Sequence, residues 1–467
     1  MNRLVRLCLL AFVAAIAFPS GALAASRMYI GFFDDAAFRW RPDRIENLDR
    51  ARDAHATLIH AAIKWNLVAP TRPQNPANPF DPAYNLADID DLVRQAQMRG
   101  LEPMLQIWGT PTWAGSAPNK APRRLSDLTN FARALASRYS GRYPGYPFVR
   151  FYGVWNEPNL NQFLSPQFDA KGRPVAPKTY AKLFAAAYAG IKAGNRQALV
   201  GLGETSARGR DRRVKGQQDT ESPGRFLQLV AKAAPKLKFD AVAHHPYPTD
   251  PKQRPEQVVR WPNVALTTIP QLERSLNKWF HRKSIPIWIT EYGHMTTPPY
   301  SGGVSYETQS SYLARAVQMA GRYPYVSMFI WFVLHDDQGD PWKSGLISED
   351  GTLKPAFFTF ANLVVNYDIR NTVITVKAGK PNPVVRVSAL EIAARNPAGT
   401  TIGVDERVIT GDSLIAHPQP VTTLGLDGWL SVPIMFTPQK GKVYYVEITA
   451  NAFNGDTVKR LLTLVAK

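Results

Sequence analysis

The segment Val149-Arg-Phe-Tyr-Gly-Val-Trp-Asn-Glu-Pro-Asn159 joins a short apolar run to an abrupt stop. Its first half has the β-branched and aromatic composition of a buried strand. Pro158 has no N–H to donate and disfavours helical backbone at the residue before it, so the strand must end near Glu157. The pattern predicts a carboxylate at the C-terminal end of a strand, with the Asn156 amide beside it and the Trp155 indole just before it.

A second segment of this kind, Ile285-Pro-Ile-Trp-Ile-Thr-Glu-Tyr-Gly-His294, lies further along the chain. Another apolar run brings Glu291 to its end, and Gly293 interrupts the pattern. Hydrolysis of a glycosidic bond with retention uses two carboxyl groups about 5–5.5 Å apart, one as nucleophile and one as acid and then base. Glu157 and Glu291 are candidates for this pair if the fold brings them together.

Between residue 28 and about 366 the chain alternates apolar runs with amphipathic stretches. Strands are predicted over 28–33, 57–65, 103–108, 149–155, 198–203, 239–244, 286–290 and 326–332, with a helical stretch after each. Eight strand–helix units are typical of a (β/α)₈ barrel, in which catalytic residues stand at the C-terminal ends of the strands. Periodicity alone does not distinguish a closed barrel from a doubly wound sheet. No glycine-rich phosphate loop follows the first strand, which counts against a nucleotide-binding fold.

Residues 367–467 have a different composition. Seven short strand patterns separated by turn signals, without a helical pattern, predict an all-β sandwich of the immunoglobulin-like kind. We therefore expect a catalytic barrel over residues 25–366 and an accessory β-sandwich domain over 367–467.

The N-terminal residues 1–24 have the organisation of a secretory signal peptide. A basic start precedes the apolar run Leu7 to Phe18, and Ala22-Leu23-Ala24 fits the small-residue rule for cleavage. We expect cleavage near Ala24 and a secreted protein, extracellular or periplasmic. The only cysteine, Cys8, lies in this segment, so the mature chain would have no thiol. No other run is long and apolar enough to predict a membrane span.

The formal net charge is +19, and most of the excess lies before residue 367. A basic secreted protein favours an anionic polysaccharide, a cell wall or nucleic acid as partner; a generally arginine-rich proteome is an equally good explanation. Three basic stretches, 120–124, 171–178 and 208–215, are expected on the catalytic side. They would suit a polymer with acidic groups, or they are simply solvated loops.

The two glutamate segments carry a family resemblance. Trp155-Asn156-Glu157-Pro158-Asn159 resembles the acid/base motif of clan A glycoside hydrolases, and Ile289-Thr290-Glu291-Tyr292-Gly293 resembles the nucleophile motif of the same clan. The resemblance implies retaining β-glycosidases on a (β/α)₈ barrel, with Glu157 as acid/base and Glu291 as nucleophile. It also implies roles for Asn156 on the sugar 2-hydroxyl, for His245 and Tyr247 in a His-X-Tyr motif beside the nucleophile, and for Trp331 as the floor of the −1 subsite.

Within the clan, families 39 and 5 are the nearest. The chain has Lys64-Trp65-Asn66 where family 5 has an arginine after the second strand, and Trp108-Gly109 where that family usually has histidine. We therefore expect family 39 first and family 5 second.

Other candidates have a structural alternative. Trp65, Trp108 and Trp155 are expected to contribute to a sugar-binding rim, although each is as readily explained by core packing. His244 is expected to be structural and His245 to face the site. Glu204 is a rival carboxylate, which we expect to pair with the arginines that follow it. No spacing indicates a metal site, and no cofactor is expected.

These observations predict a secreted retaining β-glycoside hydrolase that acts on a poly- or oligosaccharide, an anionic exopolysaccharide being one candidate. The expected partner is thus a β-linked glycan and not nucleic acid. Two alternatives use the same residues or the same fold: a transglycosylase, and a carbohydrate-binding scaffold without catalysis. The sequence leaves open the sugar and linkage, internal or terminal cleavage, the role of the β-domain and the oligomeric state.

Overall fold

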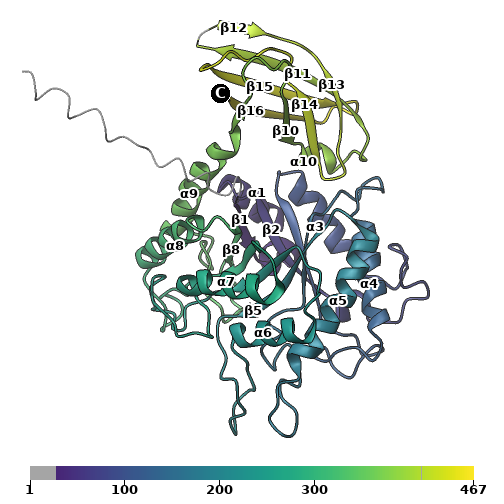
Figure 1. The fold of residues 1–467 in the computed structure, drawn as a ribbon, viewed down its shortest axis with the longest axis vertical. Coiled ribbons are helices and arrows are strands. Elements are labelled where there is room, and N and C mark those ends of the chain that lie inside the picture. Colours follow the sequence, from purple (N-terminus) through teal and green to yellow (C-terminus); the bar gives the residue numbers. More distant parts are fainter. Residues whose placement is uncertain (1–27, 412) are drawn as a thin grey trace, which may run out of the picture.

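The structure is a computed structural model that describes residues 28–411 and 413–467, so the predicted signal peptide lies outside the described residues. Eight parallel strands close into a barrel in chain order, and helices surround it (Figure 1). The predicted (β/α)₈ fold is confirmed. The barrel strands are β1 (Tyr29–Phe33), β2 (Leu58–Lys64), β3 (Glu102–Trp108), β4 (Phe151–Val154), β5 (Leu199–Ser206), β6 (Ala241–His245), β7 (Ile287–Tyr292) and β8 (Val326–Phe332).

A long helix follows each barrel strand, as predicted. They are α1 (Arg44–Asp53), α3 (Ala87–Gln97), α4 (Leu125–Arg138), α5 (Ala176–Gly194), α6 (Pro223–Ala233), α7 (Ile269–Phe280), α8 (Tyr306–Gly321) and α9 (Pro355–Thr372). Three short helical turns add to them: η1 (Ala36–Trp40), α2 (Trp65–Val68) and η2 (Leu266–Thr268). Within the described ranges, no helix combines the length and the hydrophobicity that a membrane crossing needs.

Neighbouring residues of a barrel strand face opposite layers, because successive side chains alternate along a strand. Phe32 points to the helices, where it stacks on Phe360 with ring centroids 4.4 Å apart. Phe33 points into the barrel, where it packs with residues such as Met104 and Trp288. A shift of one residue along a strand therefore decides whether a side chain points into the barrel, where it can reach the catalytic end, or out to the helices.

Strand β5 runs beyond its predicted end at Gly203 because it contains a bulge. Its register with β6 shifts between Gly203 and Thr205, so Glu204 is the extra residue. Glu204 has a positive φ of 49°, in the region that non-glycine residues rarely adopt. A bulge re-aims a side chain locally, and here it turns the Glu204 carboxylate into the barrel, where it contacts His245.

The C-terminal region consists of two sheets. A two-stranded sheet contains β10 (Val384–Ser388) and β14 (Trp429–Pro433), and the larger sheet has the order β12-β11-β15-β16-β9 with β13 on β11. The larger sheet is built from β9 (Val373–Val376), β11 (Thr401–Thr410), β12 (Ser413–Ala416), β13 (Val421–Thr423), β15 (Val443–Ala452) and β16 (Thr457–Ala466). Strand β10 ends at Ser388, and the chain continues into the short helix α10 (Leu390–Ala393), whose Leu390 and Ile392 are buried; the sequence predicted no helix in this region.

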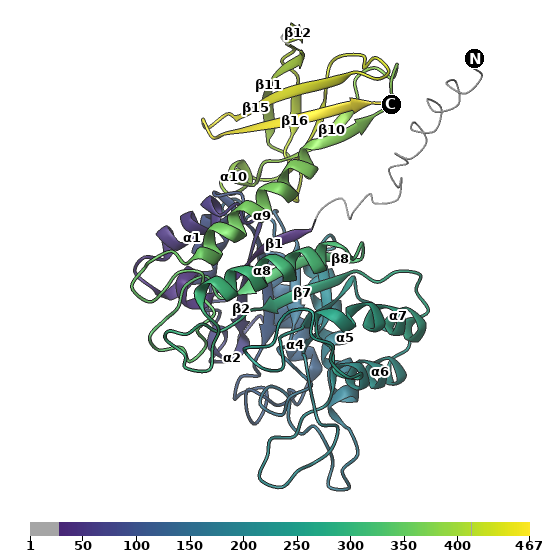
Figure 2. The same ribbon diagram turned by 90° about the vertical axis from the view of Figure 1, so that its left-hand side faces the viewer.

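This β-region packs on the N-terminal end of the barrel, away from the long loops at the other end (Figures 1 and 2). Arg150, which directly precedes β4, joins the two parts. Its Nη2 lies 3.0 Å from an Asp427 carboxylate oxygen, and its Nε lies 3.3 Å from Glu102 at the start of β3. The β-region therefore contributes nothing to the end of the barrel at which Glu157 and Glu291 stand.

A substitution of Gly31 tests how closely β1 packs on β2 in the closed barrel. A Cβ at Gly31 would overlap the Leu58 carbonyl oxygen of the neighbouring strand, and backbone cannot move aside cheaply. We expect Gly31→Ala to lower the free energy of unfolding by about 3 kcal/mol, the upper end of overpacking costs. Gly403→Ala in β11 is the matched control, because its Cβ would meet only Asn451 O at 3.8 Å. Thermal unfolding of both variants is the measurement, and equal shifts of the midpoint would contradict this packing.

Candidate active site

A cavity of about 600 Å³ opens at the C-terminal ends of the barrel strands. Its walls come from residues that follow several different strands, as in other barrels of this type. Five of the predicted site residues line it: Asn156, Glu157, Trp108, Tyr247 and Glu291. Further lining residues are Phe33, Trp40, Lys64, Gln106, Phe163, Arg208, Phe332 and Trp342.

Glu157 and Glu291 meet at His245. Nδ1 of His245 lies 3.2 Å from a Glu157 oxygen and 3.5 Å from a Glu291 oxygen. Both carboxylates therefore lie within reach of one ring nitrogen, which is the convergence of two carboxyl groups that a retaining glycosidase needs. Nε2 of His245 lies 3.2 Å from Glu204. One buried imidazole therefore contacts three carboxylates.

The backbone around Glu157 is held in an uncommon conformation. Trp155 has a φ of 71° and Glu157 a φ of 34°, both in the left-handed region. The Trp155 N–H donates to Ile107 O at 2.6 Å, and the Glu157 N–H donates to Glu204 O at 2.9 Å. These bonds to β3 and β5 compensate for a conformation that costs of order 1–3 kcal/mol per residue. The proline stop predicted from the sequence thus becomes a tight turn that presents Glu157 to the cavity.

Two neighbours orient the catalytic candidates. The Tyr247 hydroxyl donates to Glu291 at 3.0 Å. Burial and the adjacent Glu291 carboxylate raise the pKa of Tyr247 well above its usual value, so this hydroxyl keeps its proton. Gln106 on β3 donates to the Asn156 side-chain oxygen at 3.2 Å. That bond leaves the Asn156 NH₂ as the group that can meet a substrate hydroxyl.

The charges of the cluster are coupled. Burial lowers the pKa of His245, but the Glu291 carboxylate and the contacts with Glu157 and Glu204 outweigh it and raise that pKa to about 10. Burial raises the pKa of Glu291 to about 7; the Glu157 carboxylate acts in the same direction, while His245 and the Tyr247 hydroxyl oppose it. Near neutrality His245 is therefore a cation, and Glu291 lies close to its midpoint of ionisation.

Three of the predicted sugar contacts are corrected by the structure. Trp65, Trp155 and Trp331 are fully buried and do not line the cavity. Because strand residues alternate, Trp331 faces the helix side of the barrel, where it packs on Tyr292, and its neighbour Phe332 forms the cavity wall. The resemblance placed the aromatic floor one residue too early.

Trp65 and Trp155 have packing roles. Trp65 lies between helices and stacks on Phe131 at 5.5 Å between centroids. The Trp155 indole N–H donates to Phe163 O at 2.7 Å and thereby fixes the loop that follows β4. Neither side chain can stack on a sugar while it is fully buried.

A second set of aromatic groups lines the open part of the cavity. Trp108, as predicted, is there, edge-on to Phe163. Trp40, on η1, is 55% exposed and was not singled out from the sequence. The Lys64 ammonium lies between them, 5.9 Å from the Trp40 ring centroid and 5.8 Å from that of Trp108. Exposed indoles beside a cation form a surface suited to a sugar ring with a polar or acidic substituent.

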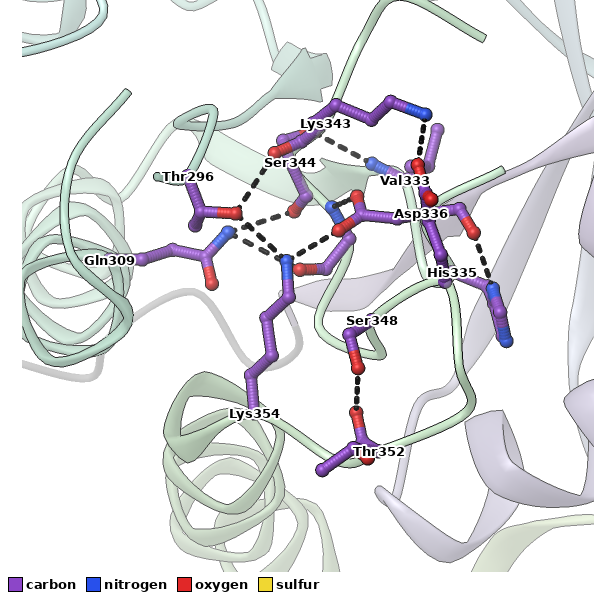
Figure 3. A network of polar contacts seen from close by, with 12 residues as sticks. Thr296, Gln309, Val333, His335, Asp336, Lys343, Ser344, Ser348, Thr352 and Lys354 are labelled. Carbon is purple, nitrogen blue, oxygen red and sulfur yellow. Dashed lines mark hydrogen bonds and ion pairs between the residues drawn. The ribbon is translucent and has the colours of Figure 1, made fainter. Parts of the chain in front are cut away.

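The cavity wall after β8 is fixed by a buried polar network (Figure 3). Lys354 Nζ lies 2.6 Å from Asp336 and 3.0 Å from the Thr296 hydroxyl, and the Lys354 and Asp336 side chains are fully buried. The other Asp336 oxygen accepts from Gly345 N at 2.7 Å, and the Ser344 hydroxyl accepts from Val333 N at 3.1 Å. The network holds the segment that carries Phe332 and Trp342 against Tyr247, as the 5.0 Å Tyr247–Trp342 ring contact shows.

Two further residues of β5 and β6 have defined partners. His244 is fully buried, with Nδ1 2.8 Å from the Thr205 hydroxyl and Nε2 3.1 Å from Val264 O, which is the structural role expected for it. Glu204 was expected to pair with the arginines that follow it. It is instead buried in the barrel and contacts His245 and Thr290. The positive φ at Glu204, which no sequence pattern announces, is the reason for this difference.

Comparison with known proteins agrees with this architecture. The family model "Cellulase (glycosyl hydrolase family 5)" matches residues 33–335. A family 39 glycoside hydrolase from the gut symbiont Bacteroides cellulosilyticus WH2 is 20% identical, with a TM-score of 0.54 over 87% of this chain and 81% of that chain. GH5_18 from Streptomyces cattleya, in complex with GlcNAc, is 16% identical, with a TM-score of 0.52 over 80% and 88% of the two chains.

At these identities the two structures show the fold alone, whereas the family model covers more than half of the chain, from the end of β1 to just after β8. The predicted clan A relationship is confirmed, and the family whose model matches is the one that sequence analysis ranked second. The chain belongs to glycosyl hydrolase family 5, and it is a glycosidase of clan A, which hydrolyses O-glycosyl bonds with retention through two carboxylates.

Proposed function

We propose that the protein is a secreted β-glycoside hydrolase in which Glu291 is the nucleophile and Glu157 the acid/base. The observation that carries this proposal is the meeting of the two cavity-lining carboxylates at one buried imidazole, with the Tyr247 hydroxyl on Glu291. Secretion rests on the signal-like residues 1–24 of the sequence alone. A poly- or oligosaccharide fits the open cavity and its exposed Trp40.

The reaction proceeds by double displacement. Glu291 attacks the anomeric carbon while Glu157 gives its proton to the glycosidic oxygen, which leaves with the aglycone. Glu157, now a carboxylate, removes a proton from water, and the resulting hydroxide displaces Glu291 from the anomeric carbon. The Tyr247 hydroxyl bond keeps the attacking Glu291 oxygen in place.

The electrostatics of the pair suit this cycle. Burial and the Glu157 carboxylate raise the pKa of Glu291 to about 7, while His245 and the Tyr247 hydroxyl act against them. Attack on the anomeric carbon needs the charged form of Glu291. As pH falls through about 7 Glu291 takes up a proton and can no longer attack.

Glu157→Gln tests the acid role. We expect kcat/KM to fall by about 10²–10⁴ on glycans, whose leaving groups need a proton, and far less on 2,4-dinitrophenyl β-glycosides. In the wild type kcat/KM should decline as pH falls below about 7, because Glu291 takes up a proton, and this acid limb should remain for the variant acting on the dinitrophenyl substrate. Equal losses on both substrate types would contradict the assignment of Glu157.

An anionic glycan is the substrate class that we favour. Lys64 lies in the cavity between two indoles; it interacts electrostatically with Asp35, which is itself paired with Arg39. Arg208 also lines the cavity. The basic loops are joined to one another on this side, since Lys120 Nζ lies 3.0 Å from the Ser165 hydroxyl and Asn161 N donates to Asp219 O at 3.0 Å. A uronate, pyruvate or phosphate group could be held by Lys64.

The substrate class is tested with one uronate-containing polysaccharide before and after chemical reduction of its carboxyl groups. We expect kcat/KM to be about 10- to 100-fold higher on the acidic form, the value of a charge-assisted hydrogen bond. Lys64→Met should remove this preference, and added salt should weaken it. Lys459→Met, an exposed change in β16, is the control. A wild type that prefers the reduced polymer would contradict an anionic substrate.

A further inference from the structure

Glu204 is a third carboxylate at the centre of the site, and the reaction described above gives it no role. Its side chain is fully buried and does not line the cavity. One oxygen lies 3.2 Å from His245 Nε2 and accepts from the Thr290 hydroxyl at 2.5 Å. The other oxygen has no hydrogen-bond partner among the described residues. A buried carboxylate is costly unless a cation compensates for it, and His245 is the group placed to do so.

The backbone conformation of β5 and a glycine on β4 make room for the Glu204 carboxylate. Glu204 occupies the bulge of β5 with a φ of 49°, next to Gly203 at 118°. On β4, Gly153 leaves the space that the free Glu204 oxygen fills, since a Cβ there would overlap it. The Glu204 carbonyl also accepts from Glu157 N. Strain of this kind persists where the surroundings fix it, and it concentrates at functional sites.

We propose that Glu204 is a positioning residue that holds His245 as a doubly protonated imidazolium between the two catalytic glutamates; this inference rests on the proposed roles of Glu157 and Glu291. The imidazolium donates Nε2–H to Glu204 and Nδ1–H toward Glu157 and Glu291. Its charge stabilises the Glu291 carboxylate before attack. After proton transfer it stabilises the Glu157 carboxylate that must act as base.

The proton balance explains why the charge of Glu204 matters. With a neutral partner at position 204, His245 would keep one proton, on Nε2, and Nδ1 would present a lone pair to Glu157. Protonated Glu157 would then donate a hydrogen bond to Nδ1. Its proton would no longer be available to the glycosidic oxygen. Glu291 would at the same time lose its neighbouring cation.

The other histidines and the tyrosine near His245 are uncharged, so His245 is the cation of the cluster. His60 on β2, 3.4 Å from Thr290 O, has its pKa lowered to about 3 by burial and by the charge of His245. His244 has its pKa lowered to about 3, chiefly by burial. Tyr247 stays protonated. Of these three neighbouring histidines, only His245 contacts carboxylates, namely Glu157, Glu204 and Glu291.

Glu204→Gln keeps the shape of the side chain and removes its charge. With the 2,4-dinitrophenyl β-glycoside that the wild type turns over best, we expect kcat to fall about 10- to 100-fold, the scale for outer partners that orient a directly acting group. KM should change little, and the alkaline limb of kcat/KM should move to lower pH, because His245 now loses its proton more easily. Glu221→Gln is the matched control, a buried glutamate in the connection from β5 to α6 whose side-chain oxygens have no hydrogen-bond partner among the described residues; it should leave kcat and the pH profile unchanged.

A wild-type kcat and pH profile in Glu204→Gln would overturn the proposal. A second readout needs no variant of Glu204: in protein labelled with ¹⁵N-histidine, one buried imidazole should carry protons on both nitrogens at pH 8. Finding every buried imidazole singly protonated would also overturn it. Failure of the proposed function would give a different result: the wild type would turn over no β-glycoside. The ¹⁵N measurement would still decide the protonation state of His245.

Discussion

The site depends on one interaction: a fully buried imidazole that contacts three carboxylates, each from a different strand. His245 ends β6, Glu157 follows β4, Glu204 lies in β5 and Glu291 in β7. Carboxyl groups gathered at this distance and out of water disfavour one another's charged forms, and a cation among them offsets this cost. The geometry of the barrel end therefore follows from charge neutralisation as much as from packing. The strained backbone at Trp155, Glu157 and Glu204 accommodates this clustering of charged groups.

The two ends of the molecule have separate tasks. At one end the strands open into the cavity, whose wall after β8 is fixed by the buried Lys354–Asp336 pair. At the other end Arg150 bridges the start of the barrel strands to Asp427 of the β-region. Because the β-region lies opposite the cavity (Figures 1 and 2), the described residues that line the cavity all belong to the barrel.

Much of this arrangement could be predicted from the sequence. The eight apolar runs give the barrel, and the proline after Glu157 together with the glycine after Glu291 gives the two strand ends, since these signals act locally. Features that depend on distant contacts could not be predicted. The alternation of β8 places Phe332 and not Trp331 on the cavity, and a register that shifts by one residue reverses such an assignment. The bulge at Glu204 has no local signature beyond Gly203, because it is fixed by pairing with β6 and by space beside Gly153.

The most direct measurement is to trap the covalent intermediate. A panel of 2-deoxy-2-fluoro-β-glycosides with dinitrophenyl leaving groups, incubated with the full protein, should inactivate it and add a single glycosyl unit to the intact mass. Peptide mapping should locate that unit on Glu291. A label on Glu157 or Glu204, or the absence of any label under conditions of measurable turnover, would contradict the assignment of Glu291 as the nucleophile on which the account rests.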